Sequence, residues 1–329
     1  MRLVFAGTPS VAVPSLDRLR AAGHELVAVI SRQDAPLGRK RVLTASPVSA
    51  WAQEHGVPTI KANRLTETVT ARVAALQPDL GVIVAYGGLV REPLLSTPRL
   101  GWINLHFSLL PRWRGAAPVQ HAILAGDQET GAAVFQLVPE LDAGAVFATS
   151  RRSIDPDETA GELLEALAFD GAKLLVAVVD QLAAGTAHAE EQTGEQTAAP
   201  KITLEDARLR WSEPAAAVYD RIRAVTPEPG AFTYLDGERF KLLTVRRSQA
   251  RHSQARHSQA RHSQARQSAE RIPDRAPQPG QVIQRGAQIL IGTATEPLEL
   301  VEVQPAGKRP MSAAAWWHGR PRDAVTVAL

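Results

Sequence analysis

The sequence has 329 residues and no cysteine. Disulfides, thiolate nucleophiles and cysteine-ligated zinc are therefore excluded, and a reducing cytoplasm is the expected location. No apolar run approaches the ~20 residues that a membrane-spanning helix needs, so we expect no membrane partner. The opening stretch MRLVFAGTPS holds too short an apolar segment for a secretory signal.

Two common nucleotide-binding signatures are also missing. The turn after the first predicted strand reads GTPSVA, without the G-x-G-x-x-G spacing that brings a backbone close to a pyrophosphate. The chain has no Walker lysine pattern either. A tight turn is the simpler interpretation of GTPSVA, and we expect neither NAD nor ATP.

The charge of the chain is unevenly distributed. Residues 206–329 hold 19 Lys and Arg against 12 Asp and Glu, a net charge of +7, whereas residues 1–205 hold 18 against 22, a net charge of −4. A basic second half on an acidic first half predicts an anionic partner that contacts the C-terminal part. Scattered positive charge also serves solubility, so charge alone leaves that partner open.

Strands and helices alternate over the first 184 residues. The expected strands are 2–6, 25–31, 80–86, 102–106, 132–138 and 145–154, and the expected helices are 11–22, 48–55, 67–76, 118–125 and 159–184. Ser10 is the expected N-cap of the first helix. This alternation predicts a Rossmann-like, doubly wound parallel sheet, in which ligands bind beyond the carboxyl ends of the strands.

The remainder of the chain has the pattern of a smaller β domain. Short predicted strands at 230–235, 239–245, 280–284, 288–293 and 298–303 are separated by turn residues and follow a short helix at 215–224. Such spacing predicts a small barrel or sandwich. We expect a first domain over 1–188, a polar linker over 189–205 and a second domain over 206–329.

A low-complexity insertion at about 248–272 interrupts the second domain with the repeat SQARH. A period of five fits neither helix nor strand, so its histidines would form no metal-binding face, and we expect no metal. The simplest interpretation is a solvated hairpin extension. A weak, salt-sensitive contact with nucleic acid is the alternative.

The stretch INLHFSLLPRWRGAAP at 103–118 carries the strongest chemical signal. Asn104 and His106 are two residues apart at the end of a predicted strand, so their side chains point to the same side. An amide can hydrogen-bond a developing oxyanion, and an imidazole can do the same or move a proton near neutral pH. The pair suits attack on an acyl carbon, although a structural histidine is the plainer alternative.

A carboxylate follows a later strand, at Asp142 in PELDAG. Beside an imidazole it would stabilise the imidazolium form and raise the pKa of His106. Asp-Ala-Gly is also common turn chemistry, so an ordinary turn aspartate remains the alternative. Sequence spacing alone does not show that Asp142 reaches His106.

The block NLHFSLLPRWRGAAP, with LDAG downstream, resembles the folate-dependent formyltransferase family. The signature of that family reads Asn-x-His-x-Ser-Leu-Leu-Pro, then an Arg-Gly segment and a later Leu-Asp-x-Gly. The stretches FAGTPSVAVPSL, AYGGLV and QPAGKRPMSA extend the resemblance over nearly the whole chain. It implies a Rossmann-like catalytic domain and a C-terminal oligonucleotide-binding (OB-like) domain that grips tRNA.

The resemblance also implies a reaction. The formyl donor would be 10-formyltetrahydrofolate, and the acceptor would be the amino group of methionine esterified to initiator tRNA. Asn104 would hold the formyl oxygen, His106 would stabilise the oxyanion and handle protons, and Asp142 would tune His106. The loop associated with tetrahydrofolate would comprise Ser108, Leu109, Leu110 and Pro111.

The basic stretch QDAPLGRKRVLTASPV at 33–48 reads as a long loop. Charge alone indicates a solvated loop, whereas the resemblance implies that Arg39, Lys40 and Arg41 contact the acceptor end of tRNA. Phe107 stands where the family favours a small residue, so it either narrows the pocket or packs beside the folate.

The sequence leaves two other functions open. One is formyl transfer to a sugar-nucleotide or ribonucleotide amine, and the other is RNA binding without catalysis. We expect a monomer, because no long apolar heptad run occurs.

Overall fold

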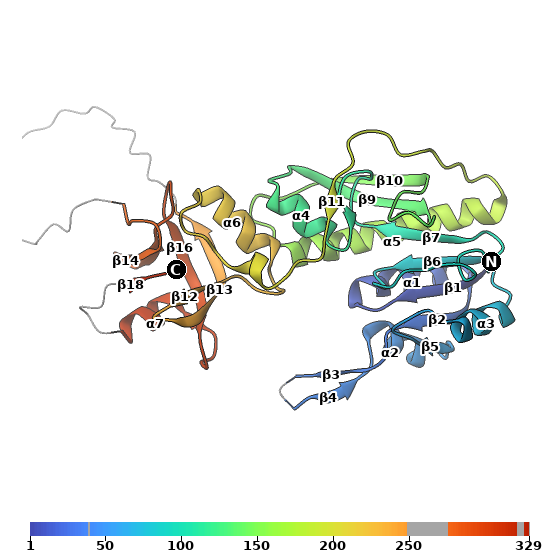
Figure 1. Cartoon of the computed structure of the whole chain (residues 1–329), viewed down its shortest axis with the longest axis horizontal. Helices are drawn as coiled ribbons and strands as arrows, with labels where there is room; N and C mark the ends of the chain where they lie inside the picture. Colours follow the sequence, from blue (N-terminus) through green and yellow to red (C-terminus); the bar gives the residue numbers. More distant parts are fainter. Residues whose placement is uncertain (39, 249–275, 321–325, 329) are drawn as a thin grey trace, which may run out of the picture. The chain divides into compact units, whose positions relative to one another are not determined.

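The computed structural model describes residues 1–38, 40–248, 276–320 and 326–328. Arg39 and nearly all of the 248–272 insertion therefore lie outside the described residues. The chain divides into two compact units, 1–202 and 203–329, which we describe separately (Figure 1). Over the described ranges, every helix is too short or too polar to cross a membrane.

The first unit is built on a seven-stranded sheet in the order β10-β9-β7-β6-β1-β2-β5 (Figure 1). Its strands are β1 (Arg2–Gly7), β2 (Glu25–Ser31), β5 (Thr59–Lys61), β6 (Leu80–Val84), β7 (Trp102–His106), β9 (Glu129–Gln136) and β10 (Val146–Ser153). Strands β5, β2, β1, β6 and β7 run parallel, and β9 runs antiparallel to both of its neighbours. The predicted Rossmann-like sheet is confirmed, with one reversed strand.

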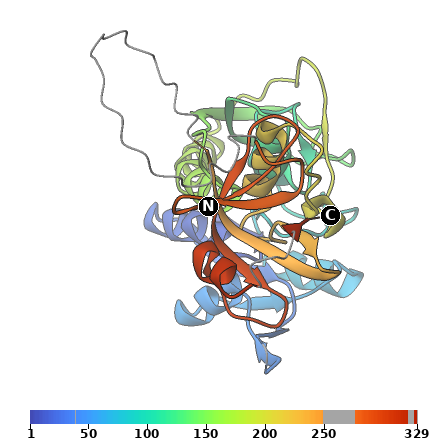
Figure 2. The same ribbon diagram turned by 90° about the vertical axis from the view of Figure 1, so that its left-hand side faces the viewer.

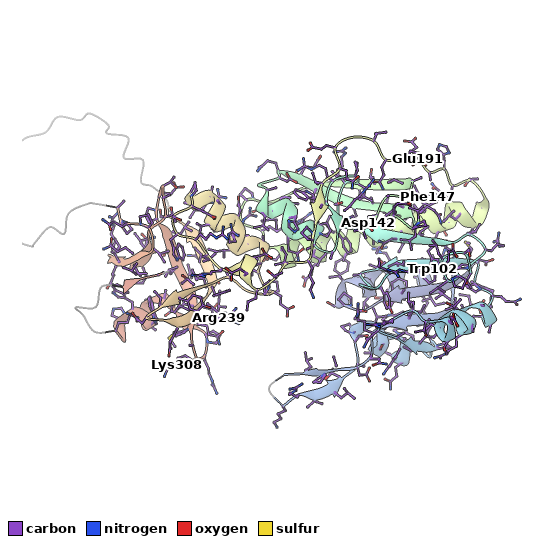
Figure 3. All side chains as sticks on the ribbon, in the orientation of Figure 1. Trp102, Asp142, Phe147, Glu191, Arg239 and Lys308 are labelled. Atoms are coloured by element: carbon purple, nitrogen blue, oxygen red, sulfur yellow. The ribbon has the colours of Figure 1, made fainter. Side chains whose placement is uncertain are left out.

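Helices cover both faces of this sheet. The helices of the first unit are α1 (Val13–Ala21), α2 (Pro47–Glu54), α3 (Glu67–Ala75), α4 (Pro118–Leu124) and α5 (Ala160–Ala184). Helix α5 packs on α1, α4, β9 and β10. On the other face, Val69 and Val73 of α3 join a buried cluster that includes Trp102, whose position is marked in Figure 3. Burying such side chains contributes about 1.5–3 kcal/mol each.

The start of α1 differs from the prediction. A short 3-10 turn occupies Ser10–Ala12, and α1 begins at Val13 with Ala12 at its N-cap position and no side-chain cap. The expected capping role of Ser10 is therefore wrong. Pro14 lies in the first turn of α1, where its missing N–H leaves no helical hydrogen bond broken.

The basic stretch at 33–48 contains secondary structure that the sequence analysis did not predict. Strands β3 (Ala35–Leu37) and β4 (Val42–Thr44) pair as an antiparallel hairpin, with Lys40 and Arg41 at its turn. Leu37, Val42 and Leu43 are 60% exposed or more. The hairpin therefore presents both positive charge and apolar surface.

The polar segment that follows α5 is held against the first unit. Glu190 forms an isolated bridge with Val146. Further along, β11 (Ala198–Ala199) pairs in parallel with β8 (Arg114–Gly115). This segment therefore has backbone partners in the sheet and in the loop after β7.

The second unit is a curled antiparallel sheet (Figure 2). The strand order is β12-β13-β16-β15-β14-β18, with β17 paired to β16. The strands are β12 (Phe232–Leu235), β13 (Glu238–Arg247), β14 (Gln281–Arg285), β15 (Gln288–Ile291), β16 (Leu298–Pro305), β17 (Met311–Ser312) and β18 (Thr326–Val327). An isolated bridge between Leu235 and Ala328 links the two ends of the sheet, so the predicted small β-barrel is confirmed. Helix α6 (Ala215–Ala224) packs on β13, and helix α7 (Ala313–His318) packs on β15 and β16.

Candidate active site

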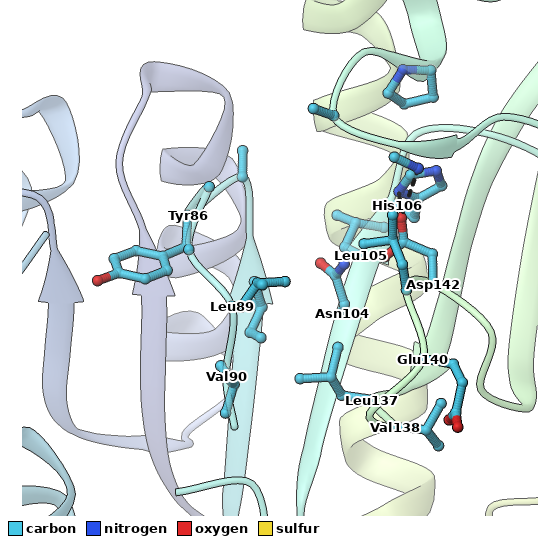
Figure 4. Close-up of a pocket in the computed structure, with 18 of the residues that line it drawn as sticks. Tyr86, Leu89, Val90, Asn104, Leu105, His106, Leu137, Val138, Glu140 and Asp142 are labelled. Atoms are coloured by element: carbon cyan, nitrogen blue, oxygen red, sulfur yellow. Dashed lines mark hydrogen bonds and ion pairs between the residues drawn. The ribbon is translucent and has the colours of Figure 1, made fainter. Parts of the chain in front are cut away.

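A cavity of about 460 Å³ lies at the carboxyl ends of β6 and β7 (Figure 4). Its walls come from the end of β6 and the loop after it, the end of β7, the segment around β8, and the loop after β9. The lining residues are 83, 85–90, 104–107, 115, 116, 118 and 137–142. The volume suits a drug-sized ligand, and the few polar groups stand among apolar side chains, as in typical ligand pockets.

Asn104 presents a polar group that the protein leaves unpaired. Its side chain is partly buried and lines the cavity. The amide oxygen Oδ1 is buried and has no hydrogen-bond partner among the described residues. Leaving a buried polar atom unpaired costs about 1–3 kcal/mol, so the atom stands ready for a donor on a ligand. The amide can also donate through Nδ2.

His106 stands two residues further along β7, as the strand pattern predicts. The residue is buried, with 6% of its surface exposed. Its Nε2 lies 2.9 Å from the carbonyl oxygen of Trp113. A carbonyl can only accept, so Nε2 carries a hydrogen and donates it. In the neutral ring this leaves the lone pair on Nδ1.

Asp142 lies beside His106 on one side of the cavity, although 36 positions separate them in the chain. Its Oδ2 lies 3.9 Å from Nδ1 of His106, and Figure 4 shows the two side chains together. The same oxygen accepts a hydrogen bond of 2.8 Å from the backbone N–H of Gly115. The loop after β9 therefore brings a buried carboxylate within charge-interaction distance of the imidazole.

Burial lowers the pKa of His106 below its usual 6.5, because removing an imidazolium from water is costly. The Asp142 carboxylate and the Trp113 carbonyl both act to raise that pKa, and burial outweighs them. The expected effect of Asp142 is therefore confirmed in sign, and the larger effect of burial was not predicted from the sequence. At neutral pH His106 is therefore uncharged and able to accept a proton.

The four residues predicted to hold tetrahydrofolate are not part of the cavity lining. Ser108 is buried and donates its hydroxyl to the carbonyl of Arg112 at 2.6 Å. Leu109 packs against the position of Gly131. Leu110 and Pro111 continue the turn toward Trp113. A direct folate contact for Ser108, Leu109, Leu110 and Pro111 stays a prediction. Phe107, by contrast, is buried in the cavity wall.

Several residues of the site lie in the stretches quoted above but were given no individual role from the sequence. Trp113 and Gly115 hold His106 and Asp142 through backbone atoms, which do not depend on side-chain type. Leu89 and Leu141 line the cavity and are 62% and 58% exposed, so they form an apolar rim. Their role depends on loop paths that periodicity does not reveal.

Comparison with known proteins gives consistent matches. The sequence model named Formyl transferase matches residues 1–179, and the one named Formyl transferase, C-terminal domain, matches residues 201–321. A methionyl-tRNA formyltransferase of Leifsonia xyli is 60% identical over 99% of both chains. A protein of the same name from Clavibacter sepedonicus is 55% identical over 97% of both chains.

Solved structures with the same fold are more distant in sequence. The methionyl-tRNA formyltransferase of Clostridium thermocellum is 16% identical, with a TM-score of 0.55 over 76% of this chain and 95% of that one. A sugar 3N-formyltransferase, WlaRD, is 13% identical, with a TM-score of 0.64 over 94% of this chain and 99% of that one. With two family models covering most of the sequence and relatives more than half identical over its length, the chain belongs to the formyl transferase family.

Proposed function

We propose that the protein transfers the formyl group of 10-formyltetrahydrofolate to the amino group of methionyl-tRNA, giving the N-formylmethionyl initiator tRNA used in translation. The observation that carries the proposal is the convergence of Asn104, His106 and Asp142 on one cavity. A protein that only binds RNA does not need these three side chains to converge. The high identity to proteins named methionyl-tRNA formyltransferase supports the choice of acceptor. The reaction would take place in the cytoplasm, with the enzyme acting as a monomer.

The cavity fits a folate-sized donor. Its rim and walls include the apolar side chains of Leu89, Val90, Leu137 and Leu141, which can pack against flat rings. The buried unpaired Oδ1 of Asn104 offers an acceptor to an N–H group, and its Nδ2 offers a donor to the formyl oxygen. These residues would hold the donor with its formyl group between Asn104 and His106.

In the proposed reaction, the neutral methionyl amine attacks the formyl carbon and forms the new C–N bond. Asn104 donates to the oxygen as negative charge develops there, which typically contributes about 3 kcal/mol. His106 accepts the proton from the attacking amine on Nδ1, because its Nε2 already donates to Trp113. The bond from carbon to N10 then breaks, and His106 returns the proton to the departing folate nitrogen.

Asp142 supports the charged form of His106 during this transfer. The free site keeps the imidazole neutral, so it starts as a base. Once it holds the proton, the carboxylate 3.9 Å away stabilises the imidazolium. One histidine can therefore accept a proton and release it within a single turnover.

We propose that the β3–β4 hairpin contacts the acceptor end of tRNA. Lys40 and Arg41 are exposed at its turn, beside the exposed Leu37 and Leu43. Positively charged side chains bind backbone phosphates, and apolar side chains can pack on unstacked bases. Arg39, the third residue predicted for this contact, lies outside the described residues.

The second unit carries arginines that lie over aromatic rings, one of which, Phe232, is buried. The guanidinium of Arg239 lies 4.1 Å from the ring centre of Phe232, and that of Arg208 lies 5.3 Å from the ring centre of Tyr234. Arginines stacked on aromatic rings recur in RNA recognition. Together with the net charge of +7 over 206–329, they favour a polyanionic acceptor over a small amino sugar.

One assay separates this function from its alternatives. Purified protein and 10-formyltetrahydrofolate, labelled in the formyl group, are supplied with methionyl-tRNA, an amino-sugar nucleotide or glycinamide ribonucleotide. We expect label in methionyl-tRNA and background in the other two. Label in a small acceptor alone would identify the sugar or ribonucleotide enzyme. Tight tRNA binding without any transfer would identify a non-catalytic RNA-binding protein.

Two substitutions test the assigned roles in the same assay. We expect Asn104→Ala and His106→Ala each to slow turnover about a hundredfold or more, because each removes a group that acts on the reacting atoms. The far-ultraviolet circular dichroism spectrum should be unchanged. Near-normal turnover by either variant contradicts the role of that residue.

A further inference from the structure

Two residues on either side of His106 have an unusual backbone. Trp113, whose carbonyl accepts the hydrogen of Nε2, has φ of 61°, and Asp142, whose carboxylate faces Nδ1, has φ of 48°. Side-chain-bearing residues in this left-handed region cost about 1–3 kcal/mol each and persist only where their surroundings hold them. The groups that hold these two backbones therefore fix the positions of the carbonyl and the carboxylate that face the imidazole.

Both backbones are held by one segment, residues 190–200, which we call the clasp. The hydroxyl Oγ1 of Thr197 accepts from the backbone N–H of Trp113 at 2.8 Å. The side-chain amide of Gln192 donates through Nε2 to the carbonyl oxygens of Asp142 and Gly144, both at 2.8 Å. The clasp thus reaches the loop on each side of His106 by a side-chain hydrogen bond.

The clasp is itself fixed by Arg114. The Oε1 of Gln192 accepts from Arg114 Nε at 3.1 Å and from Nη2 at 2.6 Å, and Gln196 accepts from Nη1 at 2.9 Å. Backbone pairing of β11 with β8 adds to this. That pairing is so close that a Cβ at Gly115 would lie 2.5 Å from the carbonyl oxygen of Ala199. Gln192 therefore has a defined orientation.

The clasp acts through other residues, because none of its members lines the cavity. We propose that Gln192 and Thr197 are positioning residues for formyl transfer, which fix the Asp142 and Trp113 groups on the two sides of His106. This inference rests on the function proposed above. It assigns a part in the reaction to a segment whose composition resembles that of a simple linker.

Loss of the Gln192 donors frees the backbone of Asp142 to leave the left-handed region, and its carboxylate moves away from His106. A misplacement of about 1 Å in a catalytic arrangement can cost about a hundredfold in rate. We therefore expect a fall in kcat of about tenfold to a hundredfold with the KM for methionyl-tRNA unchanged, because the clasp makes no contact within the cavity. The acidic limb of the kcat profile should move to lower pH, since the carboxylate no longer raises the pKa of His106.

The Gln192 test uses three variants. Gln192→Met keeps the length of the side chain and removes both its hydrogen-bond donor and its acceptor. It should therefore show the lowered kcat and the shift of the acidic limb of the kcat profile to lower pH. Gln192→Glu restores an acceptor for Arg114 but not the donors, so its kcat should stay low. Gln196→Ala removes one Arg114 contact and leaves Asp142 held, so its kcat should match that of the wild type. Recovery of activity in Gln192→Glu overturns the proposal, because Gln192 would then act through Arg114.

Two variants of Thr197 give an independent test. Thr197→Val keeps the shape and removes the acceptor of the Trp113 N–H, so kcat should fall. Thr197→Ser keeps the hydroxyl and should restore kcat. An inactive wild type would count against the proposed function. An active wild type with full kcat in both Gln192→Met and Thr197→Val, even at a lower melting temperature, overturns the positioning role.

Discussion

Replacing Asp142 by Asn removes a charge beside His106 and leaves the shape of the side chain unchanged. The amide oxygen can still accept from the backbone N–H of Gly115, as Oδ2 does at 2.8 Å. The loop after β9 should therefore keep its path. What changes is the interaction of the carboxylate with His106 once the imidazole carries a proton.

The size of this interaction follows from the distance. Two unit charges 3.9 Å apart attract by about 4 kcal/mol at an effective dielectric constant of about 20. Both side chains are at least nine-tenths buried, so salt screens the pair little. Since about 1.4 kcal/mol is a factor of ten in rate, losing most of this interaction predicts a fall in kcat of about a hundredfold to a thousandfold.

The measurement is single-turnover formylation of methionyl-tRNA with enzyme in excess, which separates chemistry from tRNA release. Glu140→Gln is the matched control, because Glu140 also lines the cavity but does not contribute to the pKa shift of His106. The control should retain the wild-type rate. An Asp142→Asn rate within about threefold of the wild type would refute the idea that the carboxylate stabilises a charged His106 in the transition state.

Three further predictions concern stability and tRNA binding. The pKa of His106 is lower in the folded state than its usual 6.5. Its contribution to stability is therefore present above pH 6.5 and lost as the pH falls through the folded-state pKa. Urea unfolding should show that the wild type loses more stability than His106→Asn between pH 7 and pH 5. Gly81→Ala would place a Cβ 2.1 Å from the buried Trp102 ring and should cost about 1–3 kcal/mol of unfolding free energy or more; an unchanged melting temperature would contradict this packing. Lys40→Ala with Arg41→Ala should raise the KM for methionyl-tRNA and flatten its salt dependence, with kcat at saturating tRNA unchanged, because phosphate contacts release counterions; an unchanged salt slope would remove the hairpin from the tRNA contact.

Much of the fold was predictable because hydrophobic periodicity depends on local sequence. The buried run at β6 and the strand ending at His106 were predictable as strands of a doubly wound sheet. The reversal of β9 was not, because periodicity reveals a strand but not its direction. The β3–β4 hairpin was missed because Gly38 and its basic neighbours have the composition of a loop, while only three residues pair on each side.

The site was predictable only where neighbours in the chain are neighbours in space. Asn104 and His106 share a face because side chains two apart on a strand point the same way. The approach of Asp142 depends on where the loop after β9 turns. The pKa of His106 depends on burial by distant side chains, Phe135 among them, so the sequence predicted the effect of one neighbour and missed the larger effect of desolvation.

The clasp shows the same limit. Gln192 and Thr197 lie in a stretch of small and polar residues that is typical of a linker. Their proposed role rests on contacts with Asp142 and Trp113, which lie about 50 and 84 positions away. Composition alone does not distinguish a polar side chain in water from one that hydrogen-bonds a loop of the candidate site.

In the proposed reaction, the amide of Asn104 and the imidazole of His106 meet one formyl group inside the cavity at the ends of β6 and β7. A crystal structure with a 10-formyl folate analogue that cannot transfer its formyl group tests this directly. We expect the formyl oxygen within hydrogen-bond distance of Asn104 and the formyl carbon facing Nδ1 of His106. An analogue bound with its formyl group outside the cavity, or with Asn104 still unpaired, would contradict it.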